Sequence, residues 1–220
     1  MNQLTFKFSF KTRYYEQDYY VSSNNFSVYR LIESWPNWPG KWINIFGPNG
    51  CGKTHLANIF TKKIKSHYIV AEDFKDYDII ENIENQECLI IDNYKNNIKE
   101  NELYSILNYL KQSNKYVVIN SLISIKNENI KLEDLKSRLS SFVDVGIELP
   151  TDDLLRVIIS KYFSDKQIEI TPNISEYIIK NIERSYEKVF NFIKEIDDLS
   201  LSSGKSININ LIKKVLINNE

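Results

Sequence analysis

Residues 47–54 constrain the fold of this chain more than any other part of its sequence. The segment reads GPNGCGKT and fits the phosphate-binding pattern G-x-x-x-x-G-K-[ST], the P-loop. Glycines let the backbone turn tightly, so that successive N–H groups point at one anion. In such a loop Lys53 reaches the β- and γ-phosphates of a nucleotide, and Thr54 offers its hydroxyl to Mg²⁺. The alternative is a glycine-rich turn that binds nothing.

The motif has the flanks that a P-loop requires. Residues 41–46 predict a short buried strand before it, and a helix begins after it with Leu56, Ile59 and Phe60 on one face. We therefore predict a nucleotide site. Its expected loop residues are Gly47, Pro48, Asn49, Gly50, Cys51, Gly52, Lys53, Thr54 and His55.

The composition limits the classes of function. The 220 residues are 42% apolar and 26% charged with a net charge of −1, as in a globular protein of one or two domains without a global attraction to nucleic acid. The short basic run 62–65 is either a solvated helix end or a DNA contact. Cys51 and Cys88 lack metal-ligand spacing, and no apolar run is long enough for a bilayer. We expect a cytoplasmic protein without a membrane partner, in a reducing compartment.

Residues 87–93 end in a second motif that indicates a function. Its four apolar residues predict a buried parallel strand, the Walker B strand, and place Asp92 beside the P-loop, where it holds Mg²⁺ through water. The metal site predicted from the sequence is thus Thr54 and Asp92. Many ATPases place an acidic residue at the next position to orient the attacking water. Here it is Asn93, which cannot act as a base, so we expect weak intrinsic hydrolysis.

Strands and helices alternate through residues 11–150, which predicts a parallel α/β core. Asn120 or Ser121, at the end of the fourth strand, is expected to sense the γ-phosphate. Tyr20 and Val21 either lie over the adenine base or simply pack. The expected strands are 41–46, 68–70, 87–93, 116–121 and 143–149, and the expected helices are 24–35, the one after the P-loop, 74–84, 99–112 and 132–142.

After Pro150 the pattern becomes wholly helical, so that residues 151–220 predict a small helical lid. Thr151 is expected to cap a helix to about residue 164. Thr171 caps the next one, with Pro172 in its first position. A helix over 185–201 is followed by a break at 202–204 and a last helix over 207–219.

Together, these features resemble the AAA+ layout: P-loop, Walker B strand, polar fourth-strand end, a helix with Arg138, and a lid. The run GPNGCGKTHLANIF resembles the P-loop of the replication initiator DnaA and its relatives, and residues 18–21 followed by Asn25 resemble the start of their ATPase domain. Residues 135–139 (LKSRL) look like their RLxSR box, whose second arginine is the arginine finger. Within that group, WPNWP before the first strand resembles the short Hda regulators, in their alphaproteobacterial HdaA form.

Residues 1–10 carry a second resemblance. Leu4, Phe6 and Phe8 alternate on one face, as in a first strand or in a peptide offered to a partner. With Gln3 they resemble the Q-L-x-L-x-L/F peptide by which Hda binds the sliding clamp of DNA polymerase. The resemblance therefore implies a clamp-binding peptide over residues 1–10, with Gln3, Leu4, Phe6 and Phe8 as its contacts.

The resemblance implies a negative regulator of replication initiation. The clamp (the β subunit), loaded on DNA, recruits the protein, which thus contacts DNA indirectly and stimulates ATP hydrolysis by DnaA. Arg138 is the finger supplied in trans; the alternative is a surface arginine in a salt bridge. The chain itself holds ADP or ATP with Mg²⁺, and its AAA+ face also allows a homodimer.

Three departures from DnaA bear on these roles. The box begins Asp134-Leu135 where DnaA has Arg-Leu, so one of its two arginines is missing, and position 93 is asparagine. The position that corresponds to the sensor arginine of the DnaA lid is near Glu187, with Arg184 and Lys188 on either side. Either one of these two cations takes the place of the arginine, or the lid responds less to the bound nucleotide. All three fit a protein that binds nucleotide to hold its shape.

Two other functions stay open, a DnaA-like ATPase that loads a helicase and a DNA-binding initiation factor. Loaders usually carry a sizeable helicase-binding region before the core, and here about a dozen residues precede it. Near-neutral charge weakens the DNA-binding alternative. DnaA continues after its lid into a DNA-binding domain, whereas this chain ends at Glu220, so we expect no such domain.

Overall fold

The structure is a computed structural model that describes residues 14–218. These residues fall into two compact units, which we call the core unit (14–148) and the helical unit (149–218). The two units are described separately below. The predicted clamp peptide, residues 1–10, lies outside the described residues.

The core unit is built on one five-stranded sheet in which every pair of neighbouring strands is parallel. The strand order is β2-β3-β4-β1-β5, so that the strand leading to residues 47–54 lies between β4 and β5. This confirms the predicted five-stranded parallel sheet. The strands are β1 (Trp42–Phe46), β2 (Ser66–Val70), β3 (Cys88–Tyr94), β4 (Tyr116–Ser121) and β5 (Val143–Gly146).

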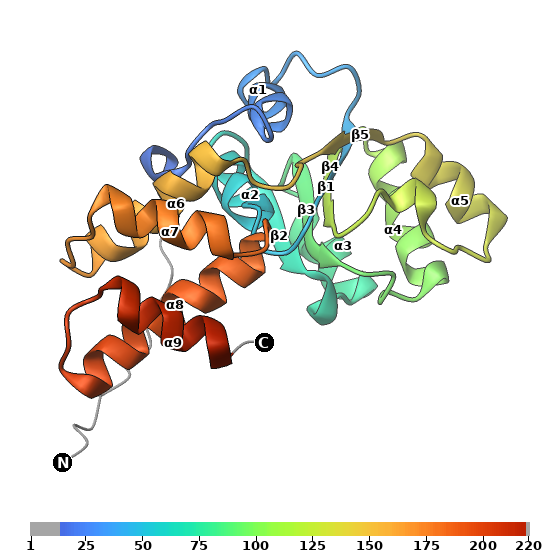
Figure 1. The fold of residues 1–220 in the computed structure, drawn as a ribbon. Coiled ribbons are helices and arrows are strands. Elements are labelled where there is room, and N and C mark those ends of the chain that lie inside the picture. Colours follow the sequence, from blue (N-terminus) through green and yellow to red (C-terminus); the bar gives the residue numbers. More distant parts are fainter. Residues whose placement is uncertain (1–13, 219–220) are drawn as a thin grey trace. The chain divides into compact units, whose positions relative to one another are not determined.

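Helices cover both faces of this sheet (Figure 1). On one side α2 packs against β3 and β4, and α1 packs against α2 and β5. On the other side lie α3, α4 and α5. The helices are α1 (Phe26–Glu33), α2 (Lys53–Thr61), α3 (Asp76–Ile83), α4 (Glu100–Gln112) and α5 (Glu133–Ser140), with 3₁₀ turns η1 (Glu16–Asp18), η2 (Ala71–Asp73) and η3 (Ile125–Asn127).

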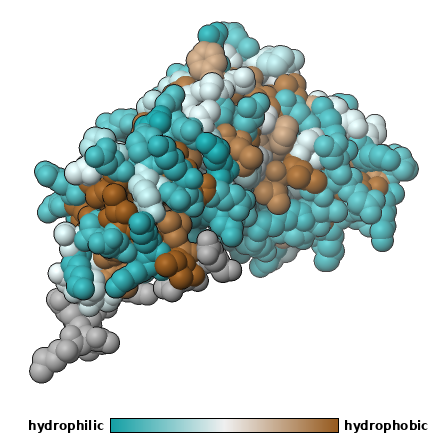
Figure 2. Space-filling view, in the orientation of Figure 1, coloured by the Kyte–Doolittle hydropathy of each residue, from teal (hydrophilic) through white to brown (hydrophobic). Residues whose placement is uncertain are grey.

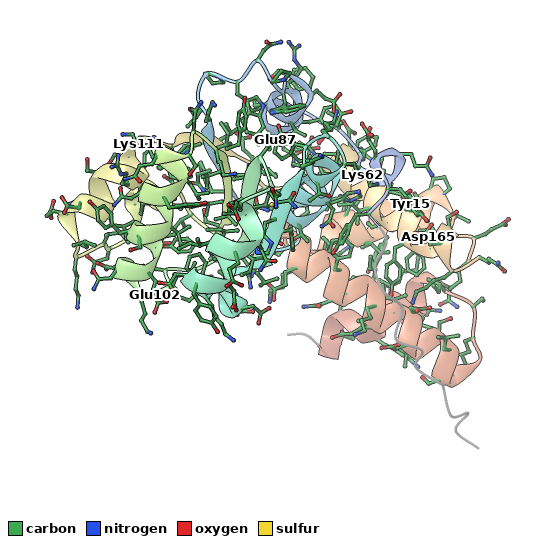
Figure 3. All side chains as sticks on the ribbon, turned by 180° about the vertical axis from the view of Figure 1, so that it is seen from behind. Tyr15, Lys62, Glu87, Glu102, Lys111 and Asp165 are labelled. Carbon is green, nitrogen blue, oxygen red and sulfur yellow. The ribbon has the colours of Figure 1, made fainter. Side chains whose placement is uncertain are left out.

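Alternation along each strand divides the buried residues between the two faces. Leu89 and Ile91 of β3 belong to the apolar cluster that also contains Leu103 and Leu107 of α4. Asp92, one residue further along, therefore projects to the opposite face, the side of α2. Charges follow the dipole of α4, with Glu102 in its first turn and Lys111 in its last (Figure 3).

A buried asparagine ties β1 to the loop after β4. The side chain of Asn44 is fully buried and donates to the carbonyl oxygen of Ile119 (2.9 Å) and to Oγ of Ser121 (2.8 Å). Its Oδ1 accepts from the backbone N–H of Ile125 at 3.1 Å. Because buried polar groups need partners, one side chain fixes where the chain turns after β4.

The helical unit consists of α6 (Asp152–Asp165), α7 (Pro172–Asn181), α8 (Tyr186–Ser203) and α9 (Ile209–Asn218). Its centre is apolar and includes Leu155, Phe163 and Ile193. Lys166 forms an ion pair with Asp197, which is almost completely buried. Hydrophilic residues cover most of the face shown in Figure 2. Among residues 14–218, no helix is long and apolar enough to cross a membrane.

The ends of several elements differ from the prediction. Thr151 caps α6 through its side chain as expected, by accepting from the N–H of Leu154. Thr171 is the N-cap residue of α7 and Pro172 follows it, as predicted, but the side chain of Thr171 makes no cap hydrogen bond. The N–H of Ile174, which that side chain could have accepted from, donates to the backbone carbonyl oxygen of Thr171 instead. Helix α8 continues to residue 203 and ends at Gly204, whose left-handed φ of 63° stops it.

Replacing Asn44 with alanine should destabilise the core unit by about 3 kcal/mol, because it leaves buried backbone groups without partners and opens a small cavity. Asn101 is an exposed residue of α4, so Asn101→Ala is the matched control and should change stability by less than about 0.5 kcal/mol. Urea unfolding monitored by circular dichroism measures both. Equal stability of the two variants would show that the buried amide contributes little.

Candidate functional site

The loop over residues 47–54 joins β1 to α2, at the edge of the sheet where the strands have their carboxyl ends. Two of its glycines leave no room for a side chain. A Cβ on Gly47 would lie 2.7 Å from the carbonyl oxygen of Ile147, and one on Gly52 would lie 2.9 Å from the ring of Tyr19. Gly52 also has a left-handed φ of 99°. The loop therefore has the tight backbone that its sequence pattern predicts.

Lys53 is the first residue of α2, and its ammonium group turns back over the loop. Nζ donates to the carbonyl oxygens of Gly47 (2.6 Å) and Pro48 (3.0 Å). Neutral carbonyls are weaker acceptors for an ammonium group than phosphate oxygens are. A phosphate in the loop can therefore take over this ammonium group from the loop's own carbonyls.

The carboxylate of Asp92 is the centre of the polar cluster beside the loop. It is 4% exposed, and its Oδ2 accepts from the hydroxyls of Thr54 (2.7 Å) and Tyr68 (2.6 Å). Its Oδ1 accepts from Nδ2 of Asn120 at 2.9 Å. Strands β2, β3 and β4 and helix α2 each contribute one residue to this cluster. The structure thus brings the two predicted magnesium ligands, Thr54 and Asp92, into direct contact.

The two candidate sensors on β4 point in opposite directions. Asn120 faces Asp92, whereas Ser121 faces the other side of the sheet, where Asn44 donates to it and where its own hydroxyl donates to the carbonyl oxygen of Ile123 (2.5 Å). Alternation along the strand makes these placements mutually exclusive. Asn120 is therefore the candidate that the geometry favours, and Ser121 lies outside the cluster.

Asn93 follows Asp92 and has a left-handed φ of 60°. Its Nδ2 donates to Oε1 of Glu72 at 3.0 Å. Glu72 lies in η2, directly after β2. No sequence pattern indicated it, because the contact depends on the pairing of β2 with β3. The carboxylate of Glu72 is therefore hydrogen-bonded to Asn93, the position at which many ATPases carry an acidic residue.

Tyr68 was also missed by sequence reasoning. It looks like an ordinary strand residue, and only the register shows that β2 runs beside β3 with Val70 opposite Asp92. Tyr68 precedes Val70 by two residues, so both side chains lie on the face that carries Asp92. Burial and the nearby carboxylate raise the pKa of the Tyr68 phenol, which therefore stays protonated at neutral pH.

The segment before α1 packs on the helix that follows the loop. Nε2 of His55 lies 2.7 Å from the carbonyl oxygen of Tyr15, and the ring of His55 contacts that of Tyr19 edge to face. Nζ of Lys62 lies 5.8 Å from the centre of the Tyr15 ring (Figure 3). Tyr19 is therefore the residue placed against the loop, beside the predicted Tyr20 and Val21. Tyr20 itself is 47% exposed.

Both cysteines are buried, and neither forms a disulfide. Burial raises the pKa of the Cys51 thiol, although Lys53 nearby opposes this rise. The pKa of the Cys88 thiol is raised too, again mainly by burial. Both side chains therefore behave as small apolar groups at neutral pH.

Arg138, the predicted finger, lies on α5 and is partly exposed. Its Nε donates to Oδ1 of Asn108 on α4 at 2.8 Å. Within residues 14–218 the guanidinium makes no ion pair, so the salt-bridge alternative finds no partner in this part of the chain. A neutral amide therefore orients the Arg138 side chain, and no carboxylate of residues 14–218 pairs with it.

The predicted lid cations belong to the helical unit. Nε and Nη2 of Arg184 donate to the two carboxylate oxygens of Asp152 at 2.8 and 3.2 Å. Hydrogen bonds from Arg184 hold the pKa of Asp152 below its ordinary value. Lys188 is exposed on α8 and lines a cavity of about 340 Å³ together with Glu183 and Glu195. A role of either cation at a nucleotide stays a prediction.

The donor groups of the core unit suit Mg²⁺ with a phosphate. A hydroxyl and a carboxylate are oxygen ligands, which Mg²⁺ prefers, and it usually takes its other ligands from phosphate and water. Across residues 14–218 no cluster of three or more His, Cys, Asp or Glu side chains forms a metal cage. Thr54 and Asp92 therefore fit the metal of a magnesium–nucleotide complex.

Comparison with known sequences gives two kinds of relative. The chain is 28% identical to the chromosomal replication initiator protein DnaA of Borreliella burgdorferi, over 94% of this chain and 53% of that protein, so it spans about half of that relative's length. It is 21% identical to an uncharacterised protein of Haemophilus influenzae, over 91% of this chain and 92% of that protein. A family model described as RNA helicase matches residues 43–132.

Comparison with solved structures defines the fold. Domain III of the replication initiation protein DnaA from Thermotoga maritima superposes with a TM-score of 0.75 at 19% identity, over 92% of this chain and 95% of that one. AMPPCP-bound DnaA from Aquifex aeolicus gives a TM-score of 0.64 at 21% identity, over 86% of this chain and 66% of that one. These likenesses show the fold, which is the α/β fold of AAA+ proteins. In sequence, the chain is similar to part of DnaA.

Replacing Gly52 with alanine should destabilise the core unit by about 1–3 kcal/mol, because a Cβ there meets the Tyr19 ring and the left-handed backbone strains any other residue. Gly40→Ala is the control, since a Cβ at Gly40 lies 3.5 Å from Val143, an ordinary contact. Its stability should stay within about 0.5 kcal/mol. Denaturant unfolding compares the two, and equal losses would contradict the assigned loop geometry.

Proposed function

We propose that this chain is a nucleotide-binding regulator of replication initiation, which binds ADP or ATP with Mg²⁺ and acts on the ATPase of DnaA. The nucleotide site is carried by one observation, the contact between Thr54 and Asp92 beside the loop of Lys53. AMPPCP bound to the Aquifex DnaA supports a nucleotide in this fold. The uncharacterised Haemophilus protein is matched over 92% of its own length, whereas the Borreliella DnaA is matched over 53%.

The regulatory part of the proposal rests on Arg138. An arginine finger stabilises the charge that develops on the transferred phosphate. For that purpose the side chain must be oriented and must keep its charge, and the amide of Asn108 meets both conditions. The finger would act on the nucleotide held by DnaA. We further propose that the sliding clamp recruits the protein, and thereby brings it to DNA, through Gln3, Leu4, Phe6 and Phe8. When DnaA is absent, two copies of the protein would pair with each other.

Lys53→Ala should weaken binding of ADP and ATP at least about tenfold, since a charged hydrogen bond contributes about 1.5–3 kcal/mol. Lys111→Ala removes an exposed cation at the far end of α4 and is the matched control. Isothermal titration in Mg²⁺ buffer measures both affinities. If the wild-type protein binds neither nucleotide, the site is not a nucleotide site.

Arg138→Ala should abolish the stimulation of DnaA, because a finger in trans is worth on the order of 10³ in rate in GTPases. The assay follows phosphate release by ATP-bound DnaA with clamp-loaded DNA and this protein. Lys136→Ala is the control, since Lys136 is an exposed cation on the same helix. Absence of stimulation by the wild-type protein would refute the regulatory function.

The same assay tests recruitment. The double variant Gln3→Ala/Leu4→Ala should lose stimulation with clamp-loaded DNA and should no longer be retained on immobilised clamp. Its nucleotide affinity should be unchanged, which separates loss of recruitment from loss of the fold. Retention of the double variant on the clamp would place the contact elsewhere in the chain.

The contact between Asn93 and Glu72 favours a second candidate, a DnaA-like ATPase that loads a helicase or binds DNA itself. It puts a carboxylate close to the position where such enzymes hold their base. The two functions differ in what the protein does alone. Multiple turnover of ATP without DnaA would favour the enzyme, and bound nucleotide without turnover favours the regulator.

A further inference from the structure

Tyr68 contacts the proposed metal site without belonging to its sequence motifs. Its hydroxyl donates to Oδ2 of Asp92 at 2.6 Å, and the same oxygen accepts from Thr54 at 2.7 Å. The two groups that are expected to bind Mg²⁺, the Thr54 hydroxyl and the Asp92 carboxylate, are therefore hydrogen-bonded to each other. Tyr68 donates to the same carboxylate oxygen as Thr54.

The position of Tyr68 is fixed by the sheet. Residues 66–70 of β2 pair in register with residues 88–92 of β3, so the phenol and the carboxylate come from adjacent, hydrogen-bonded strands. A tyrosine side chain has only two rotatable bonds, and that of Tyr68 is partly buried. Its hydroxyl can therefore hold the carboxylate in one orientation at little cost in conformational entropy.

The orientation of Asp92 matters because its two carboxylate oxygens have different partners. Asn120 donates to Oδ1, while Thr54 and Tyr68 donate to Oδ2. Thr54 and Asp92 would hold Mg²⁺ together, and for this the carboxylate would have to stay in place while it accepts from Thr54. Partners of this outer kind typically change metal affinity by about 10- to 100-fold.

We propose that Tyr68 is a positioning residue for Mg²⁺, which acts by holding Asp92 in the orientation that receives the metal with its nucleotide. The proposal rests on the proposed nucleotide site and assigns to it a residue from β2. The short hydrogen bond from the phenol to Oδ2 of Asp92 supports it, because the strand register keeps the hydroxyl at that oxygen. A tyrosine that served only for packing would not need its hydroxyl at this place.

The test is Tyr68→Phe, which removes one oxygen and keeps the ring. A fluorescent ADP analogue is titrated first in EDTA and then at fixed nucleotide with increasing Mg²⁺. Affinity in EDTA should be unchanged, and the Mg²⁺ concentration for half-maximal tightening should rise about tenfold. Tyr116→Phe is the matched control, because Tyr116 lies at the amino end of β4, opposite the end that carries Asn120. Its Mg²⁺ response should equal that of the wild type.

A double-mutant cycle links the effect to the carboxylate. In an Asp92→Asn background, Tyr68→Phe should cause no further loss of Mg²⁺ response, since the two residues act as one unit. An unchanged Mg²⁺ response of Tyr68→Phe would overturn the inference and leave the nucleotide site standing. Equal losses with and without Mg²⁺, or additive losses in the cycle, would also overturn it by indicating a packing role. A wild-type protein that binds no nucleotide in either buffer would refute the nucleotide site itself, and the inference with it.

Discussion

The buried carboxylate of Asp92 is the constraint on which the polar edge of the core unit depends. A carboxylate that is 4% exposed is stable only if donors satisfy its oxygens. Three elements around β3 supply them, namely α2 through Thr54, β2 through Tyr68 and β4 through Asn120. The requirement therefore fixes the relative positions of three strands and a helix at the place where the loop over residues 47–54 ends.

The loop over residues 47–54 is held in place by two further segments of the core unit. Its glycines lie against Ile147, which follows β5, and against Tyr19, which precedes α1, so the loop is enclosed by segments far apart in sequence. Nζ of Lys53 meanwhile donates to carbonyl oxygens of the loop itself. An enclosed loop with a preformed cation loses little conformational entropy when an anion binds, which is how a rigid site gains affinity.

The sequence pattern was sufficient to predict the sheet, the loop and the position of Asp92. A buried parallel strand has an unbroken apolar run, and the loop has a defined sequence motif. It left Asn120 and Ser121 as alternatives, since only the paired strands show which face each one takes. Tyr68 and Glu72 had no signal at all. Their contacts join β2 and β3 across more than twenty residues of sequence, and pairing register is not written in the local pattern.

Asn93 and Arg138 have opposite environments in the structure. Asn93 has a neutral side chain that is held by a carboxylate, whereas Arg138 has a charge that is held by a neutral amide. A residue that must act on its own nucleotide needs a free base, and Asn93 provides none. In the proposed regulator, Arg138 would act on a nucleotide held by another protein, and its orientation by Asn108 and its partial exposure fit that role. In the proposed ATPase, Glu72 would supply the carboxylate that Asn93 lacks, so the Asn93–Glu72 contact is where the two proposed functions differ.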